Sequence, residues 1–260
     1  MNEYRGLTYR QRNIIEILQH KDFATIGELA DLCQVSNPTI RRDLIYLESI
    51  KFIERFYGGA KINTSRNIEI LNYHKYYSHW AEKMRIGAKA AELVEDGDFI
   101  ALNTGTTMMA FAQNLSRKKN LSIIVGDYEI ARMLSQRNDF NVLITGGKIE
   151  REVPGLVGKF SVEMIDNFYF DKYFMGVRGL NISDGLMTSR YDQAITAQAF
   201  MKNSKKNIVI TDSSKFIRQT GAIISPFNCI DILITDKGLL NFPNTYEQIK
   251  NIHTLELFLV

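Results

Sequence analysis

The stretch Ser36-Asn37-Pro38-Thr39-Ile40-Arg41-Arg42-Asp43-Leu44 decides how the first part of the chain folds. Ser36 can begin a helix, because its hydroxyl can accept a hydrogen bond from a free backbone N–H. Pro38 then falls in the first turn, where its missing N–H costs nothing. At about 100° per residue, one stripe of this helix is aliphatic and faces inward, and it carries Ile40, Leu44 and Leu47.

The other side of the predicted helix is suited to DNA. Arg41 and Arg42 lie roughly 100° and 200° around the helix axis from Ile40, so both point away from the aliphatic stripe. A short helix with a polar and basic outer side fits a DNA major groove. Two adjacent arginines alone are more typical of a solvated surface helix, so the flanking sequence decides between these interpretations. The DNA contacts predicted on this helix are Ser36, Asn37, Thr39, Arg41 and Arg42.

Two more helices are predicted before this one. Thr8 is followed three residues later by Gln11, and Thr25 by Glu28, and each pair forms the pattern of a capping box at a helix N-terminus. The second of these helices has apolar residues spaced i, i+3, i+4, i+7, at Ile26, Leu29, Ala30 and Cys33. Three short capped helices, with a tight turn at residues 34–35 between the last two, predict a helix-turn-helix.

Residues 52–60, FIERFYGGA, follow the third helix. Apolar residues around a charged pair, ending in Gly-Gly, predict a short β-hairpin, so that the first domain is a winged helix-turn-helix. Arg55 and Tyr57 are then predicted where a wing meets the DNA backbone or minor groove. For Tyr57, a simple packing aromatic is an equal alternative.

The composition is that of an ordinary globular protein, with 45% hydrophobic and 23% charged residues among 260. A formal charge of +3 is weak support for a polyanionic partner. Residues 1–62 hold nine basic and eight acidic side chains, a net charge of only +1. The placement of charges, and not their number, therefore carries the DNA hypothesis.

Other patterns bear on location and cofactors. Apolar runs stay shorter than about 18 residues and residues 1–13 lack a signal-peptide core, so we expect a cytoplasmic protein that does not enter the membrane. Cys33 and Cys229 belong to no CxxC pattern, and we expect reduced, packed thiols. The four histidines are scattered without metal-ligand spacing, so neither a metal nor another cofactor is predicted.

A second domain of α/β class is predicted from residue 79, after a first domain at 1–60 and a linker at 61–78. Short apolar runs alternate with helical stretches, as is typical of a parallel sheet covered on both faces. We therefore predict an open, mostly parallel α/β sandwich, in which ligands bind beyond the carboxyl ends of the strands. The strands are expected at 99–102, 122–125, 142–145, 172–177, 207–211, 230–235 and 254–260, and the helices at 79–91, 108–117, 128–137, 160–167, 192–203 and 244–251.

Three loops at the expected strand ends suit an anion. Residues 103–107, Asn-Thr-Gly-Thr-Thr, join a strand to a helix N-terminus and offer free N–H groups and hydroxyls. Residues 146–148 and 212–215 each add glycine or hydroxyl groups and one lysine, a combination that favours a phosphate ester over a neutral ligand. The loop at 103–107 is also compatible with an ordinary N-cap. The predicted ligand contacts from these loops are Asn103, Thr104, Gly105, Thr106, Thr107, Gly146, Gly147, Lys148 and Lys215.

TIRRDLIYLESIKFIERFYGGA, at residues 39–60, resembles the DNA-binding signature of the DeoR family of bacterial repressors. Tyr57 stands where that family usually has histidine, and Lys51 where it has glycine. The resemblance continues through NTGTT, GGK and ITDSSKF over nearly the whole chain. It implies a sensor domain similar to sugar-phosphate isomerases that binds phosphorylated sugars or related metabolites, which usually weaken operator binding.

The sensor domain departs from the family pattern in its expected pocket. Gly126-Asp127-Tyr128 replaces the family's Thr-Asn-Ser, and Arg178 replaces an acidic residue. Gln193 and Ala197 stand where an acid and a lysine are common. Arg178 is therefore predicted to contact the ligand, where it can meet a second acidic group.

Three functions are compatible with these patterns. We predict a ligand-regulated repressor without enzymatic activity, which binds double-stranded operator DNA as a homodimer or homotetramer because one module makes few contacts. A DNA-binding regulator whose pocket is degenerate or controlled by a protein partner is a second possibility. A sugar-phosphate isomerase or deaminase is the third, although Arg178 and Gln193 are unsuited to general base catalysis.

Overall fold

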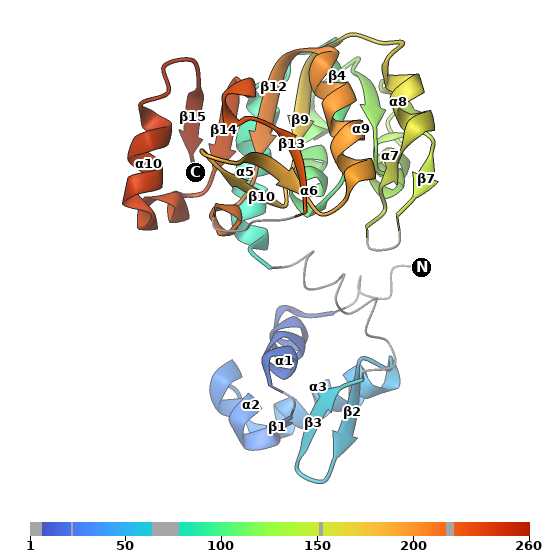
Figure 1. Cartoon of the computed structure of the whole chain (residues 1–260). Helices are drawn as coiled ribbons and strands as arrows, with labels where there is room; N and C mark the ends of the chain where they lie inside the picture. The colour runs from blue at the N-terminus through green and yellow to red at the C-terminus, as the bar shows by residue number, and fades with distance from the viewer. Residues whose placement is uncertain (1–6, 22, 64–77, 151–152, 217–220) are drawn as a thin grey trace. The chain divides into compact units, whose positions relative to one another are not determined.

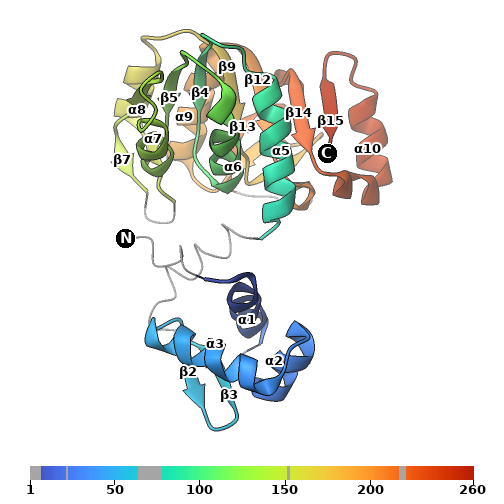
Figure 2. The same cartoon turned by 180° about the vertical axis from the view of Figure 1, so that it is seen from behind.

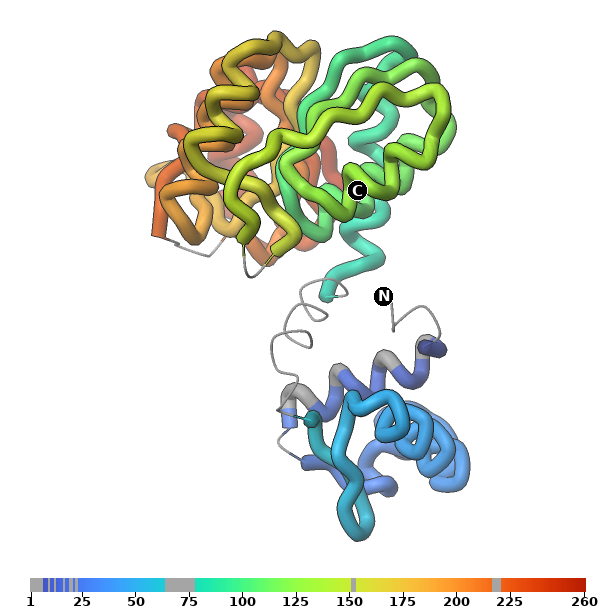
Figure 3. Tube along the Cα trace, turned by 90° about the vertical axis from the view of Figure 1, so that its right-hand side faces the viewer, coloured from blue at the N-terminus to red at the C-terminus, as the bar shows by residue number. Residues whose placement is uncertain are grey.

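The computed structural model describes residues 7–21, 23–63, 78–150, 153–216 and 221–260. It divides into two compact units, Met1–Tyr76 and Tyr77–Val260, which are described separately. Figure 3 follows the chain through both units in sequence order. Most of the predicted linker, residues 64–77, lies outside the described residues.

The first unit begins with the three predicted helices, α1 (Tyr9–His20), α2 (Ile26–Cys33) and α3 (Asn37–Ser49) (Figure 1). Both predicted capping boxes are confirmed, at Thr8 and at Thr25. The aliphatic stripe of α3 is also confirmed, because its side chains are buried against α1 and α2. These buried residues are Ile40, Leu44 and Leu47.

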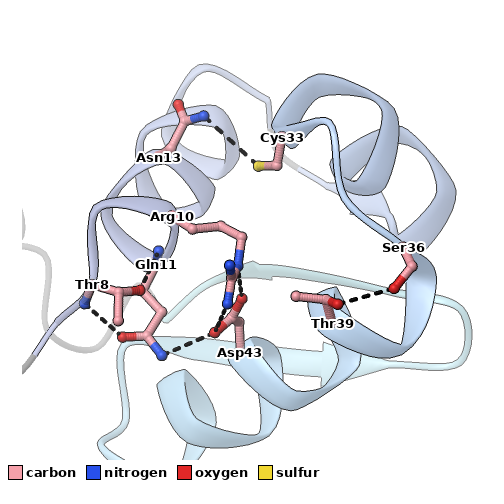
Figure 4. Close-up of polar contacts among 8 residues, drawn as sticks. All are labelled: Thr8, Arg10, Gln11, Asn13, Cys33, Ser36, Thr39 and Asp43. Atoms are coloured by element: carbon pink, nitrogen blue, oxygen red, sulfur yellow. Dashed lines mark hydrogen bonds and ion pairs between the residues drawn. The ribbon is translucent and has the colours of Figure 1, made fainter.

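The predicted side-chain cap at Ser36 is wrong. The Ser36 hydroxyl caps no backbone N–H, and lies 2.9 Å from the hydroxyl of Thr39 instead (Figure 4). The backbone carbonyl of Ser36 still accepts hydrogen bonds from the N–H groups of Thr39 and Ile40. The N–H of Thr39 is thus already satisfied by the Ser36 carbonyl, and Pro38 has no N–H to be capped.

The predicted wing is confirmed as an antiparallel hairpin of β2 (Ile53–Phe56) and β3 (Gly59–Ile62). A third strand of two residues, β1 (Ala24–Thr25), pairs with β3 and places Ala24 opposite Ala60. β1 has no sequence signal, because two residues are too short for alternation. The sheet order β1-β3-β2 ties the start of α2 to the wing (Figure 1).

The second unit contains a seven-stranded sheet in the order β15-β14-β12-β9-β4-β5-β6, and all its pairings are parallel. The predicted open α/β sandwich is therefore confirmed, and each predicted strand overlaps an observed one. The strands are β4 (Phe99–Leu102), β5 (Ser122–Val125), β6 (Asn141–Ile144), β9 (Phe170–Met175), β12 (Ser204–Ile210), β14 (Ile232–Thr235) and β15 (Glu256–Leu259).

Helices cover both faces of this sheet (Figures 1 and 2). Each face of the sheet contributes to its own apolar core, as successive residues of β4 show. Ile100 and Leu102 belong to one core, and Ala101 belongs to the other. α5, α6 and α7 contribute to the first core, and α8, α9 and α10 to the second. The helices are α5 (Trp80–Glu92), α6 (Thr106–Asn114), α7 (Tyr128–Leu134), α8 (Lys159–Ile165), α9 (Tyr191–Lys202) and α10 (Pro243–Lys250).

Short elements that carry no clear sequence signal complete the unit. Two small antiparallel sheets contain β7 (Lys148–Ile149) with β8 (Leu156–Val157), and β10 (Gly179–Asn181) with β11 (Gly185–Thr188) and β13 (Ala222–Ser225). The 3-10 helices are η2 (Leu115–Arg117), η3 (Ser213–Lys215), η4 (Phe227–Cys229) and η5 (Lys237–Asn241). Among the described residues, every helix is too short or too polar to cross a membrane.

Candidate DNA interface and effector site

The outer face of α3 is polar, basic and exposed. Asn37, Arg41 and Arg42 are exposed, as predicted, and Ser36 lies at the N-terminus of the same face. Thr39 is half-buried beside Ser36. Within the residues that the structure describes, neither arginine forms an ion pair, so both guanidinium groups can meet phosphate or a base edge.

Asp43 anchors α3 from behind, on the side opposite the arginines. Its side chain is buried, at 4% exposure, and accepts hydrogen bonds from Arg10 Nε at 2.5 Å and Gln11 Nε2 at 3.0 Å (Figure 4). The hydrogen bond to Asp43 also raises the pKa of Arg10. The position of Asp43 beside the aliphatic stripe of α3 indicates that its carboxylate is buried. The sequence does not reveal its partners, because they lie more than thirty residues earlier.

The wing is braced against the end of α3 by an ion pair. Arg55 lies in β2, and its Nη2 is 2.7 Å from Glu48 Oε2 on α3. If Arg55 contacts DNA as predicted, its guanidinium group does so while it is also paired with Glu48, through the N–H groups that do not bind the Glu48 carboxylate. Tyr57 is fully exposed at the hairpin turn, so the packing alternative for this residue is wrong.

In the second unit, the loop after β4 is built around Gly105. Gly105 has φ +124° and caps the N-terminus of α6, a backbone conformation that side chains rarely adopt. The Asn103 amide bridges to Gly176 after β9, since it donates to the Gly176 carbonyl at 2.9 Å and accepts from its N–H at 3.0 Å. The loop is thus held rigidly while the α6 N-terminus is directed to the sheet edge, an arrangement suited to an anion.

Asp127 joins this loop to the N-terminus of α7 by hydrogen bonds. Thr104 Oγ1 donates to Asp127 Oδ2 at 2.7 Å, and the other carboxylate oxygen caps α7 by accepting from the N–H groups of Glu129 and Ile130. Burial raises the pKa of Asp127 to about 6, against the opposing effect of these hydrogen bonds. Of the predicted loop contacts, Asn103 and Thr104 therefore serve as supports, whereas Gly105 and Thr106 remain at the helix N-terminus and Thr107 is buried.

The loop at 146–148 has a structural role. A Cβ on Gly147 would lie 2.4 Å from Ser161 Oγ, and the Gly146 carbonyl accepts a hydrogen bond from that hydroxyl at 2.7 Å. These glycines let α8 pack closely on the loop. Lys148 is exposed and lies 3.4 Å from Asp192 Oδ2, so its ammonium group is directed toward α9.

A polar cluster adjoins the Gly105 loop. Gln193 Nε2 donates to the buried Glu150 Oε2 at 2.6 Å, and Thr188 Oγ1 donates to Gln193 Oε1. The Arg178 N–H bonds the carbonyl of Met187, the residue before Thr188, at 3.0 Å. The structure thus places the backbone of Arg178 beside the strand whose Thr188 contacts Gln193. It also adds Glu150, which the sequence does not single out because it lies 43 positions from Gln193.

Two lysines converge at the end of β12. Lys215 Nζ lies 3.9 Å from Asp212 Oδ2, and Lys83 of α5 interacts electrostatically with both residues. Lys83 is buried and donates to the Ser78 carbonyl at 2.6 Å, and burial lowers its pKa to about 8. Lys83 has no sequence signal, because a lysine within an amphipathic helix is usually solvated.

All of these groups lie at one edge of the sheet, because parallel strands end on the same side. The loops after β12, β9, β4, β5 and β6 follow one another in the sheet order. They present two lysines, an arginine and a helix N-terminus beside buried carboxyl groups. Such a mixture can bind a phosphate and, next to it, hydroxyl groups. Among the described residues, no cluster of His, Cys, Asp or Glu is suited to a metal ion.

Comparison with known proteins agrees with both units. Residues 10–66 match the DeoR-like helix-turn-helix domain, and residues 78–237 match the DeoR C terminal sensor domain. The glycerol-3-phosphate regulon repressor of Escherichia coli (strain K12) is 29% identical over 229 residues, 88% of this chain and 90% of that protein. The HTH-type transcriptional regulator FruR of Bacillus subtilis (strain 168) is 30% identical over 240 residues, 92% and 95% of the two chains.

A solved structure of ribose 5-phosphate isomerase A from Methanocaldococcus jannaschii aligns with a TM-score of 0.40 and 19% identity, over 54% of this chain and 56% of that one. The two family models together span both compact units and confirm the resemblance found in the sequence. The chain belongs to the DeoR family of DNA-binding transcriptional regulators.

Proposed function

We propose that this regulator is a repressor of a sugar-metabolism operon and that a phosphorylated sugar or related phosphorylated metabolite controls its binding to the operator. The observation that carries the effector assignment is the rigid Gly105 loop at the N-terminus of α6, on the same sheet edge as Lys83 and Lys215. The repressors to which the chain is similar include one of a glycerol-3-phosphate regulon and a putative repressor of the aga operon.

In the proposed complex, the phosphate binds the N–H groups of Thr106 and Thr107 in the first turn of α6, while the Gly105 N–H stays bonded to Asp127. The lysine pair at the end of β12 neutralises a second negative charge or part of the same phosphate. The hydroxyl groups of the metabolite meet Glu150 and Gln193, whose oxygens and amide suit a polyol. Arg178 contributes where the metabolite carries a further acidic group.

Operator recognition is assigned to the outer face of α3 and the wing. Some of their predicted contact residues bind phosphates and set the register, while Asn37, Arg41 and Arg42 are the ones assigned to base edges. A single module makes few such contacts, so we propose a homodimer or homotetramer on repeated half-sites. The effector acts by binding one arrangement of the DNA-binding units more tightly than another.

We further propose that the sensor unit is not an enzyme. The carboxyl groups described at this edge are buried, and each already has partners. Glu150 accepts from the Gln193 amide, Asp127 from Thr104 and the N-terminus of α7, and Asp212 from the Ser214 N–H beside Lys215. A general base needs access to the substrate proton. Turnover of a sugar phosphate by the purified protein would contradict this assignment.

The test is fluorescence anisotropy of the purified protein on DNA from upstream of its own gene. Binding is measured at several salt concentrations against random DNA, then with a panel of sugar phosphates at fixed salt. We expect tight, salt-sensitive binding that one phosphorylated compound reverses. Specific binding that no compound changes would contradict the effector assignment and favour a degenerate or partner-controlled pocket. The absence of specific binding would contradict the repressor assignment itself.

A further inference from the structure

The outer face of α3 holds a large aliphatic side chain between its two arginines. Ile45 is 53% exposed although it lies on a helix whose opposite stripe is fully buried. Arg41 and Arg42 precede it by four and three residues, so Ile45 is a neighbour of each arginine on the helix surface, with Cβ atoms roughly 5–6 Å apart in each pair. The exposed apolar group is therefore framed by the cations that face DNA.

The charges on this face favour DNA over a protein partner. The exposed residues of α3 from Asn37 to Ser49 include two arginines and no unpaired acid, since Asp43 is buried and Glu48 is paired with Arg55. A polyanion is complementary to such a face, whereas a second copy of it would place like charges together. If DNA occupies this face, the exposed side chain of Ile45 also contacts DNA.

We propose that Ile45 is a specificity-determining residue that reads the 5-methyl group of a thymine in the operator. This inference rests on the proposed operator binding. The major groove displays one apolar group, the thymine methyl, and an aliphatic side chain on the groove-facing side of a recognition helix is suited to contact it. Because Arg41 and Arg42 flank Ile45, the thymine lies within or next to the base pairs that these arginines contact.

The test removes the methyl group and nothing else. Each thymine of the footprinted operator is replaced in turn by uracil, and the affinity of the full-length protein is measured by anisotropy at fixed salt. Wild-type protein should lose about three- to fivefold in affinity at one thymine of each half-site, the change expected for one buried methyl group. Ile45→Ala should bind the thymine and uracil operators equally at that position and keep its sensitivity elsewhere.

Leu32→Ala is the matched control, because Leu32 on α2 is exposed to the same extent, 54%. This variant should retain the wild-type response to uracil. Both side chains are exposed, so both variants should fold, which thermal unfolding and sedimentation check.

A thymine response that survives in Ile45→Ala would overturn the inference while leaving operator binding intact. A change of oligomeric state in Ile45→Ala would also overturn it, in favour of a subunit contact. Lack of specific binding by the wild type would overturn both assignments.

Discussion

Arg10 of α1 donates a hydrogen bond to Asp43 of α3 from the side of the helix that faces away from Arg41 and Arg42. α3 is therefore held in two ways, by the burial of its aliphatic stripe and by the buried carboxylate of Asp43, whose hydrogen-bond partners come from α1. Because the carboxylate is directional, it fixes the rotation of α3 about its own axis more tightly than apolar packing alone. That rotation decides which side chains reach the groove.

Asp43→Ala should destabilise the first unit by about 1–3 kcal/mol, the range for leaving a buried hydrogen-bond donor such as Gln11 unsatisfied. Chemical denaturation of the full-length protein, followed by circular dichroism, measures the change. Asp31→Ala, which removes an exposed acid from α2, is the control and should have little effect. Equal stability of the Asp43 and Asp31 variants would contradict the anchoring role.

Arg41→Ala should weaken specific operator binding by roughly ten- to a hundredfold, as expected when a base or phosphate contact of an arginine is lost. The sensor unit should fold and bind effector as before, because Arg41 lies in the other compact unit. Operator titrations by anisotropy provide the measurement. Arg132→Ala removes an exposed arginine from α7 and should leave operator affinity unchanged. Normal affinity of the Arg41 variant would remove α3 from its assigned role.

Thr106→Val should impair the response to the effector and spare operator binding, because Thr106 is the first residue of α6 at the proposed phosphate site. The dose of phosphorylated compound needed to release DNA should rise at least several-fold. Thr245→Val changes a threonine in the first turn of α10 and is the matched control. An identical dose response in both variants would count against the Gly105 loop as the anion site.

The stability of the sensor unit should depend on pH through Asp127. Its pKa is about 6 in the folded protein and 3.8 in the reference state, so the folded state retains a proton that the unfolded chain has released. Stability should therefore fall as pH rises from about 4 to 6, by up to about 3 kcal/mol, and then level off. Asp127→Asn, which has no titratable group at this position, should lack this fall. Parallel pH profiles for the two proteins would contradict the buried-carboxyl assignment.

Effector binding should weaken above about pH 8, where Lys83 loses its charge. Burial lowers the pKa of this ammonium group from 10.5, so its positive charge is present below about pH 8 and is lost above it. Calorimetric titration with the releasing phosphorylated compound should show this loss in wild type and little pH dependence in Lys83→Gln. Lys89→Gln, on the same helix, should behave like wild type. A flat profile in wild type would exclude Lys83 from the site.

Local patterns were sufficient for the architecture. The capping boxes at Thr8 and Thr25, the aliphatic stripe of α3 and the alternation of strands and helices in the sensor unit can all be recognised from residues a few positions apart, and each is confirmed. The predicted side-chain cap at Ser36 was wrong because the Thr39 N–H bonds the Ser36 carbonyl and the Ser36 hydroxyl contacts the Thr39 hydroxyl. Strands such as β1 and β10 are too short for any periodicity to indicate them.

The composition of the candidate sites depended on tertiary structure, because their decisive pairs join distant positions. Arg10 and Asp43, Thr104 and Asp127, and Glu150 and Gln193 are separated by 33, 23 and 43 residues. Burial, which moves the pKa values of Asp127 and Lys83, is likewise a property of the folded sheet and its covering helices. The sequence by itself thus determined the main helices and strands and the exposed arginines of α3 through local periodicity, and the family through its motifs. Only tertiary structure decided which charges meet, since parallel strands gather loops from remote parts of the chain at one edge.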